Sequence, residues 1–365
     1  MDNRDNVTLV ITQSCNLSCT YCYEHHKSKA VMPLKLAKKL IRTELQSIKN
    51  NDGLELDLFG GEPFLEFELI KQITNFVQEE CSIPFVIFAT TNGTLVHGEI
   101  QEWLRDNKDI FTCGLSIDGT REMHNANRSN SYDMIDWPFF AELYPEQEIK
   151  MTISEATLPS LYKGVVDLHT KGFRVSCNLA YGIDWSQAKN IEMLDRELKK
   201  LVEYYVENPD VEPCSMLNMD ISRVGIRDNE TTAYCGAGLH MRTYDVDGQL
   251  YPCQYFTPLS VGIKKAREAQ SIQFEKGIIA KELLDEKCRE CIVLPICPSC
   301  YGANYSATGS IYMRDTNMCR LTKTIMKARA YFKARQWELG QLNETPDDLQ
   351  ALLRAIIRIQ EELQV

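Results

Sequence analysis

The distribution of cysteine is the feature that most constrains how this chain folds. Fourteen cysteines occur in 365 residues, and the polar segment Met1 to Asn6 does not resemble a secretion signal. Because the cytosol keeps thiols reduced, we interpret them as residues of a cytoplasmic metalloprotein, not as disulfides. Ten fall into two groups, one near the start and one in the last third: Cys15, Cys19 and Cys22, then Cys235, Cys253, Cys288, Cys291, Cys297, Cys300 and Cys319.

The other four cysteines are expected mainly to pack. Cys113 and Cys177 lie in apolar runs typical of strands, where a thiol behaves as a small buried apolar group. Cys81 and Cys214 lie near segment junctions, and Cys214 precedes the rear group closely enough to be a spare ligand.

Composition argues against two classes of partner. With 40 basic and 51 acidic residues, the net charge is -11. Binding to phosphates relies on Lys and Arg, so nucleic acid is not expected as a partner. No apolar run approaches the roughly 18 to 20 residues that span a bilayer, so a membrane is not expected either.

The first 208 residues alternate short apolar runs with segments of helical period, which is typical of βα units around a parallel sheet. The predicted strands are Val7 to Thr12, Leu54 to Phe59, Phe85 to Thr90, Phe111 to Ile117, Ile149 to Ser154 and Arg174 to Ala180. Six strands are too few for a closed eight-stranded barrel. The sequence therefore predicts an α/β fold built on an open, partial (β/α)6 TIM-like barrel.

The pattern changes after residue 208, which predicts a domain boundary. Residues 209–320 are rich in cysteine and punctuated by Gly and Pro. Such a stretch has too few aliphatic side chains to fold alone, so we expect metal coordination to stabilise it as a small cysteine-rich domain. Residues 321–365 form a C-terminal helical segment.

Two helices are predicted in that segment, at Leu321 to Leu339 and Pro346 to Leu363. Thr345 is the expected N-cap of the second helix. The first carries a basic series that we expect to form a solvated face: Arg320, Lys323, Lys327, Arg329, Lys333 and Arg335.

The front cysteines form a C-x3-C-x2-C motif in the loop after the first predicted strand. In a parallel βα sheet, ligands bind at the carboxyl ends of the strands, so this loop would lie over the barrel. Three thiolates can hold three irons of a 4Fe-4S cluster and leave the fourth iron open to another ligand. The alternative is a closed zinc site completed by His25 or His26.

This loop resembles the signature of the radical S-adenosylmethionine (SAM) superfamily, and the loops after the next three strands agree with it over residues 7–183. By this resemblance, Gly60-Gly61-Glu62-Pro63 holds the amino group of SAM, with glycines that allow close approach of the backbone. Tyr21 would pack beside the cluster, and Tyr23 would offer its backbone to adenine. The remaining implied SAM contacts are Asn92, Ser116, Asp118 and Arg128.

The resemblance also implies a reaction. An external electron donor such as flavodoxin or ferredoxin reduces the cluster, and SAM is cleaved to a 5′-deoxyadenosyl radical that takes a hydrogen atom from the substrate. The sequence assigns no catalytic acid or base. Asp118, Glu155 and Asp220 are simply carboxylates near the ends of predicted strands or loops.

The rear cysteines follow the spacings C-x12-G-x4-C and C-x2-C-x5-C-x2-C, with one more cysteine beyond. This layout resembles the SPASM auxiliary domain of radical enzymes that modify peptides and proteins, although that family usually separates the last pair by three residues. By this resemblance, one auxiliary 4Fe-4S cluster binds Cys288, Cys291, Cys297 and Cys319, and another binds Cys235, Cys253 and Cys300.

The resemblance thus implies three 4Fe-4S clusters in all. The cluster on three rear cysteines would have an open iron or take a fourth ligand from Cys214, His240 or a substrate thiolate. A pair of structural zinc sites is the alternative for the rear group.

We consider three functions. The preferred one is an enzyme that modifies a ribosomally made peptide and closes a thioether or carbon-carbon crosslink. The second is anaerobic sulfatase maturation, which oxidises Cys or Ser to formylglycine; those enzymes usually carry one more cysteine soon after Cys235, and residues 236–248 contain none. The third, a non-catalytic metalloprotein, is disfavoured by the four motifs.

Because few residues precede the first strand, we expect the rear domain, the C-terminal helices or another protein to recognise the peptide or protein substrate.

Overall fold

The structure, a computed structural model, describes residues 5–48, 53–226, 235–274 and 285–365. Its strands are β1 (Asp5–Thr12), β2 (Leu54–Gly60), β3 (Phe85–Thr91), β4 (Phe111–Leu115), β5 (Ile149–Ile153), β6 (Val175–Leu179), β7 (Met241–Tyr244) and β8 (Leu250–Tyr251). Its α-helices are α1 (Leu34–Ser47), α2 (Phe67–Glu80), α3 (Glu99–Asp106), α4 (Arg121–Asn127), α5 (Trp137–Leu143), α6 (Leu161–Thr170), α7 (Ala188–Glu207), α8 (Pro258–Ala269), α9 (Glu286–Arg289), α10 (Tyr301–Thr308), α11 (Cys319–Glu338) and α12 (Pro346–Glu362). Among the helices in these ranges, none is both long and apolar enough to cross a bilayer.

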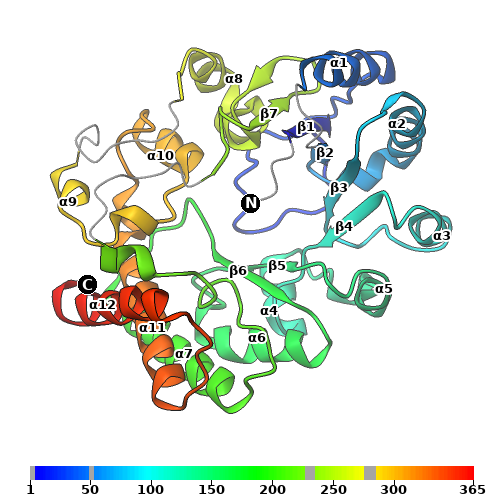
Figure 1. The fold of residues 1–365 in the computed structure, drawn as a ribbon. Helices are drawn as coiled ribbons and strands as arrows, with labels where there is room; N and C mark the ends of the chain where they lie inside the picture. Colours follow the sequence, from blue (N-terminus) through cyan, green and yellow to red (C-terminus); the bar gives the residue numbers. More distant parts are fainter. Residues whose placement is uncertain (1–4, 49–52, 227–234, 275–284) are drawn as a thin grey trace.

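The six predicted strands are confirmed, and β1 to β6 form the arc of an open barrel (Figure 1). One sheet has the order β4-β3-β2-β1-β7-β8, and β5 pairs with β6 in a second. A parallel bridge from Ser116 to Lys150 joins the two sheets. Helices α1, α2, α3 and α5 lie outside the strands, as expected for βα units (Figure 1).

Strand side chains alternate between the helices and the barrel interior. In β2, Leu54, Leu56 and Leu58 are buried in the main hydrophobic core with residues of α1 and α2. The residues between them therefore face the opposite way, into the barrel lumen. Because parallel strands all point the same way, the loops after β1 to β4 gather at one mouth of the lumen.

The rear part of the chain completes the first sheet, which the sequence analysis did not foresee. Strand β7 pairs in parallel with β1, in register from Asn6 opposite Met241 to Leu9 opposite Tyr244. Arg242 and Tyr244 both reach the buried carboxylate of Glu44 in α1, with Arg242 Nε 2.8 Å from Glu44 Oε2. The division at residue 208 stays a prediction, but the sheet itself runs across it.

The two C-terminal helices are confirmed as α11 and α12, and Thr345 Oγ1 accepts the amide hydrogen of Asp348 at the start of α12. One part of the expected solvated face is wrong. Arg329 is only 4% exposed, and its Nε donates to the carbonyl of Met216 at 2.7 Å. The helical period alone could not indicate that α11 turns this cation inward.

Candidate functional site

Two glycines bring the turn after β2 against the cysteine loop. A Cβ atom on Gly60 would lie 2.1 Å from the carbonyl oxygen of Thr12, and one on Gly61 would lie 2.3 Å from that of Ser14. Such contacts are far inside van der Waals distance, so only glycine fits at both positions. The Glu62 amide also donates to Ser14 at 2.8 Å. The turn therefore sets the path of the chain into Cys15.

Glu62 is a buried carboxylate surrounded by donors. It is 1% exposed and is the N-cap of the 3-10 helix Pro63–Glu66. Its oxygens accept from the Phe64 amide at 3.2 Å, the Thr91 hydroxyl at 2.7 Å and the Asn92 amide at 2.8 Å. Burial raises the pKa of Glu62 to about 7, and these donors lower it in part. An ionised carboxylate has about four acceptor positions, so one remains for an ammonium group.

Asn92 connects the loop after β3 to the cysteine loop. Its Nδ2 donates to Asn16 Oδ1 at 2.9 Å, and Asn16 Nδ2 donates in turn to the Thr94 hydroxyl at 2.8 Å. Asn16 could not be predicted from the sequence, because its role depends on this contact between distant loops. Ser116, at the end of β4, is bonded through its amide to the carbonyl of Thr91.

Asp118 organises the loop after β4, where it accepts hydrogen bonds from several neighbouring residues. It is fully buried, and its carboxylate accepts four hydrogen bonds, from the following donors: Tyr21 OH at 2.6 Å, Asn127 Nδ2 at 3.1 Å, Arg128 Nε at 3.0 Å and the Thr152 amide at 2.9 Å. Protein groups thus take up its acceptor capacity. The carboxylate fixes Tyr21 and Arg128, and the Arg128 guanidinium lies 5.4 Å from the centre of the Tyr21 ring.

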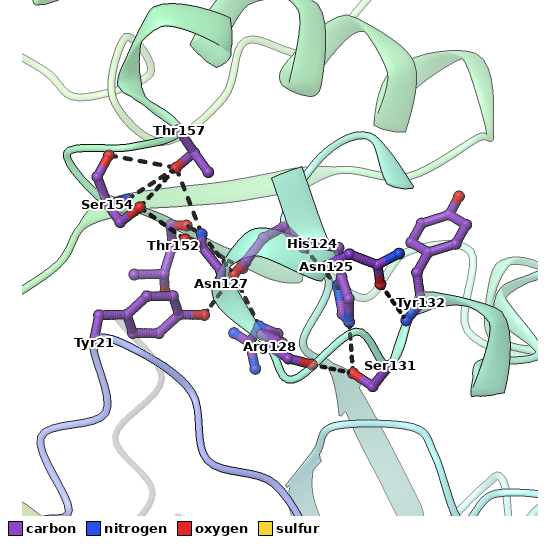
Figure 2. A network of polar contacts seen from close by, with 11 residues as sticks. Tyr21, His124, Asn125, Asn127, Arg128, Ser131, Tyr132, Thr152, Ser154 and Thr157 are labelled. Carbon is purple, nitrogen blue, oxygen red and sulfur yellow. Dashed lines mark hydrogen bonds and ion pairs between the residues drawn. The ribbon is translucent and has the colours of Figure 1, made fainter. Parts of the chain in front are cut away.

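His124 supports this network from behind. Its Nδ1 accepts from the Asp118 amide at 3.3 Å, so its Nε2 carries the proton and donates to the Ser131 hydroxyl at 3.0 Å. Ser131 in turn donates to the carbonyl of Arg128 at 2.6 Å (Figure 2). Burial lowers the pKa of His124 to about 4. A neutral imidazole therefore holds the loop that carries Arg128.

The three front cysteines lie half-buried on one loop without disulfides. Burial raises the pKa of Cys15 and of Cys19, while Lys27 lowers that of Cys15 and Arg128 lowers that of Cys19. These two cations would favour thiolates. Lys27 was not singled out in the sequence, since a loop lysine carries no signal of such a position.

Aromatic stacking joins this loop to the rear of the chain. The ring of Tyr23 stacks on that of Tyr255, with centroids 4.7 Å apart and planes inclined by 6°. The Tyr23 carbonyl accepts from the His25 amide at 3.1 Å. Gln13 adds a second link, since its Nε2 donates to Asp245 at 2.9 Å.

Electrostatic proximity separates the rear cysteines into two sets. The pKa of Cys297 is raised to about 11, chiefly by burial and in smaller part by three other thiols: Cys291, Cys319 and Cys288. Burial also raises the pKa of Cys253, and Cys300 and Cys235 act in the same direction. These are the two sets that the SPASM resemblance implies. Their role as ligands stays a prediction.

The other cysteines and the two candidate fourth ligands differ in burial. Cys113 and Cys177 are buried among strand residues, as expected for packing. Cys214 is fully buried, and its amide donates to the Tyr205 hydroxyl at 2.9 Å. His240 is exposed.

Two of the candidate acids already accept hydrogen bonds from protein groups. Glu155 accepts from Asn190 Nδ2 at 3.3 Å, and Asp220 accepts from the Ser222 amide at 2.8 Å. Within the described ranges, no three His, Cys, Asp or Glu side chains form a group that could hold a single metal ion.

The front cysteine loop suits an iron-sulfur cluster. Its thiols are the soft donors that such a cluster requires, and they lie beside two cations, so these residues fit a 4Fe-4S cluster.

Known proteins are similar to this chain in sequence and in fold. A family model described as a 4Fe-4S single cluster domain matches residues 6–134. The cysteine-type anaerobic sulfatase-maturating enzyme of Clostridium novyi (strain NT) is 23% identical over 79% of this chain and 85% of its own. The subtilosin biosynthesis protein AlbA of Bacillus subtilis (strain 168) is 22% identical over 69% of this chain and 55% of its own.

Other matches are shorter or purely structural. An uncharacterized protein of Methanocaldococcus jannaschii is 35% identical over 33% of this chain, and the match spans only 40% of that protein. The structure of native anSMEcpe with bound AdoMet superposes with a TM-score of 0.70 at 17% identity, over 92% of this chain and 100% of that one. The fold, the motifs at four strand ends and these matches together identify the chain as a radical SAM enzyme, a family that uses SAM and a 4Fe-4S cluster.

Proposed function

We propose that the protein is a cytoplasmic maturase that modifies a ribosomally made peptide by hydrogen abstraction and closes a thioether or carbon-carbon crosslink. It would carry three 4Fe-4S clusters, a SAM-binding one on Cys15, Cys19 and Cys22 and two in a SPASM-type domain at residues 209–320. Its partners would be the peptide or protein substrate and an electron donor such as flavodoxin or ferredoxin. Neither nucleic acid nor a membrane takes part in this proposal.

The proposal is supported mainly by electrostatic effects among the rear thiols: Cys291, Cys319 and Cys288 act on the pKa of Cys297, and Cys300 and Cys235 act on that of Cys253. A set of three leaves one iron of a cubane without a protein thiolate. Binding to this iron would lower the pKa of a substrate cysteine thiol, and the same enzyme would also hold the site where the radical forms.

The bound cluster and SAM would supply a carbon radical that removes a hydrogen atom from the substrate. The protein's part is to bind and orient. Glu62 would accept the SAM ammonium, and Arg128, held by Asp118 and stacked on Tyr21, would face the SAM carboxylate or ribose. Asn92, Ser116 and the Tyr23 backbone would complete the cofactor side of the site. Low exposure at Glu62 and Asp118 would limit water around the radical.

Anaerobic sulfatase maturation is the second candidate. It is favoured by the similarity to the Clostridium novyi enzyme, which extends over 79% of this chain. The absence of cysteine from residues 236–248 argues for the first candidate.

The test is an anaerobic assay of iron-loaded protein with dithionite, SAM and short peptides encoded beside its gene. We expect release of 5′-deoxyadenosine, and loss of two hydrogens from a cysteine-containing peptide with a new bond in its fragment spectrum. Conversion of a sulfatase-derived cysteine to an aldehyde would instead select the second candidate. A Cys15, Cys19 and Cys22 to Ala variant is the control and should release no 5′-deoxyadenosine. Failure of fully loaded wild type to release it with any peptide would contradict both candidates.

A further inference from the structure

A row of polar side chains crosses the interior face of the barrel, below the loops that form the candidate site. Thr8 of β1 lies between Thr243 of β7 and Asp57 of β2 in the strand register. Neighbouring strands are about 4.8 Å apart, so these three side chains are adjacent. All three have the parity of Glu55 and Phe88, which line a cavity of about 450 Å³ at the amino ends of the strands. The row therefore lies on the luminal face.

These side chains have no partner for their buried oxygens. Among the described residues, nothing hydrogen-bonds to Thr8 Oγ1, Thr243 Oγ1 or Asp57 Oδ1, and the same is true of Asn6 Oδ1 one row below. Thr8 and Thr243 are both 0% exposed. A buried polar atom without a partner costs on the order of 1–3 kcal/mol, so four together call for a ligand.

The chemistry of the four atoms selects the ligand. All four are oxygens that can accept a hydrogen bond. Two belong to hydroxyl groups, which can rotate to accept, one belongs to an amide and one to a carboxylate. Asn6 uses its Nδ2 to donate to Glu55 Oε1 at 2.8 Å, which leaves its oxygen as an acceptor. The complement is a cation with several donors, and an ammonium group provides three.

The charges around Asp57 agree with a cation. Burial raises the pKa of Asp57 to about 7, Lys150 lowers it and Glu55 raises it. Lys150 forms no ion pair with Asp57; its Nζ lies 5.6 Å from the centre of the Phe88 ring, and the residue is exposed. A cation beside the row would be balanced by carboxylates on the same strand.

The position suits a side chain that passes the radical site. Asp57 is five residues before Glu62 and three residues before Gly60, which is about 10 Å along the strand at the usual rise per residue. Asp57 is half-buried, so part of it faces the lumen.

We propose that Asp57, Thr8, Thr243 and Asn6 form a luminal ammonium site that binds a basic side chain or terminal amine of the substrate. The proposal deepens the proposed function and rests on it for the identity of the ligand. It assigns to β1, β2 and β7 the selection of a cationic substrate group, a role outside the SAM and cluster loops.

The test is the melting temperature of the anaerobic iron-loaded protein, without SAM turnover, as n-butylammonium chloride is added at constant ionic strength. Binding to the folded state raises the melting temperature, by about 1–3 °C at roughly ten times Kd. We expect this rise in wild type and in Glu148→Gln, an acidic residue of the amino-end mouth outside the row. We expect it to disappear in Asp57→Asn.

Further arms separate the alternatives. Thr8→Val and Thr243→Val keep the carboxylate and the side-chain shape and should weaken the rise, so the test stands if Asp57→Asn does not fold. A rise with n-butanol, an equal rise with potassium chloride, or a rise that survives in Asp57→Asn would overturn the proposal. A rise in melting temperature that occurs only in Lys150→Met would also overturn it, because the ammonium group of Lys150 would then be the cation that occupies the site in wild type. Because no turnover is measured, failure here is distinct from failure of the proposed reaction.

Discussion

At the scale of single residues, burial decides how the polar groups of the site behave. Glu62 and Asp118 are both carboxylates below 2% exposure, yet each is surrounded by donors that stabilise its charge. They differ in what they leave free. All the acceptor positions of Asp118 are used by protein donors, whereas one acceptor position of Glu62 remains free. Of the two carboxylates, only Glu62 can therefore accept a further hydrogen bond.

Glu62→Gln should therefore weaken SAM binding without unfolding the loop. The amide keeps the shape of the side chain but loses the charge, and a hydrogen bond to a charged group contributes about 1.5–3 kcal/mol. We expect the Kd for SAM, measured by equilibrium dialysis on iron-loaded protein, to rise by about 10- to 100-fold. Glu66→Gln, at the end of the same short helix, should leave it unchanged.

His124 should make stability depend on pH. Its pKa falls from 6.5 to about 4 on folding because burial disfavours the charged form. Its contribution is complete above pH 6.5 and is lost as the pH falls toward 4, by about 2–3 kcal/mol. We expect His124→Gln to reduce the drop in melting temperature between pH 7 and pH 5.

The control for this prediction is His97→Gln. His97 is exposed, although its Nε2 lies 2.9 Å from the carbonyl of Met134. An equal pH dependence in wild type and His124→Gln would contradict the neutral imidazole inferred for the fold.

At the scale of elements, the strands with a period-two pattern could be predicted from the sequence, but the short strand β7 from the rear of the chain could not. Strands β1 to β6 have alternating apolar residues because one face packs on helices, and this signal is local. Strand β7 is only Met241–Tyr244, too short to show a period. Its pairing depends on β1, more than two hundred residues away. The loop motifs were likewise local, whereas Asn16 and Lys27 act through contacts that no spacing reveals.

The turn after β2 should control cluster loading. Gly61→Ala places a methyl group 2.3 Å from the Ser14 carbonyl and 2.9 Å from Cys15 Cβ, without any unfavourable φ. The loop must shift, and its thiols with it. We expect iron content and absorbance near 400 nm to fall to well below wild-type values after anaerobic loading.

Gly98→Ala is the matched control for that loss. Gly98 has φ +49, so a side chain strains the backbone, but nothing lies within 4 Å of the added atom. It should lower stability without lowering iron content. Equal iron loss in both variants would mean that general destabilisation explains the result.

At the scale of the whole molecule, front and rear are joined at several points. Strand β7 pairs with β1, the Tyr23 ring stacks on Tyr255, and Gln13 bonds Asp245. Helix α11 packs on α7 (Figure 1). Arg335 Nη1 of α11 lies 2.6 Å from Glu203 Oε1 of α7, and Arg329 donates to the carbonyl of Met216 in the segment after α7. The molecule should therefore hold its rear thiols at a set position relative to the barrel mouth.

The iron inventory tests the three-cluster proposal. Wild type should bind about twelve irons, the content of three cubanes. Cys288→Ala with Cys291→Ala, and separately Cys253→Ala with Cys300→Ala, should each remove about four. Both should still cleave SAM, because the front cluster is untouched. Cys81→Ala, a free half-buried cysteine outside both groups, should lose none.

Pairing between β1 and β7 also has a consequence for biosynthesis. Until β7 has been synthesised, β1 can pair only with β2 in this sheet and would present its other edge to solvent, along with the thiols that follow it. An open edge is a template for association with other chains. A nascent chain would thus need protection for its first strand until residue 244 emerges, and a polypeptide stopped at 208 should be recovered mainly as aggregate.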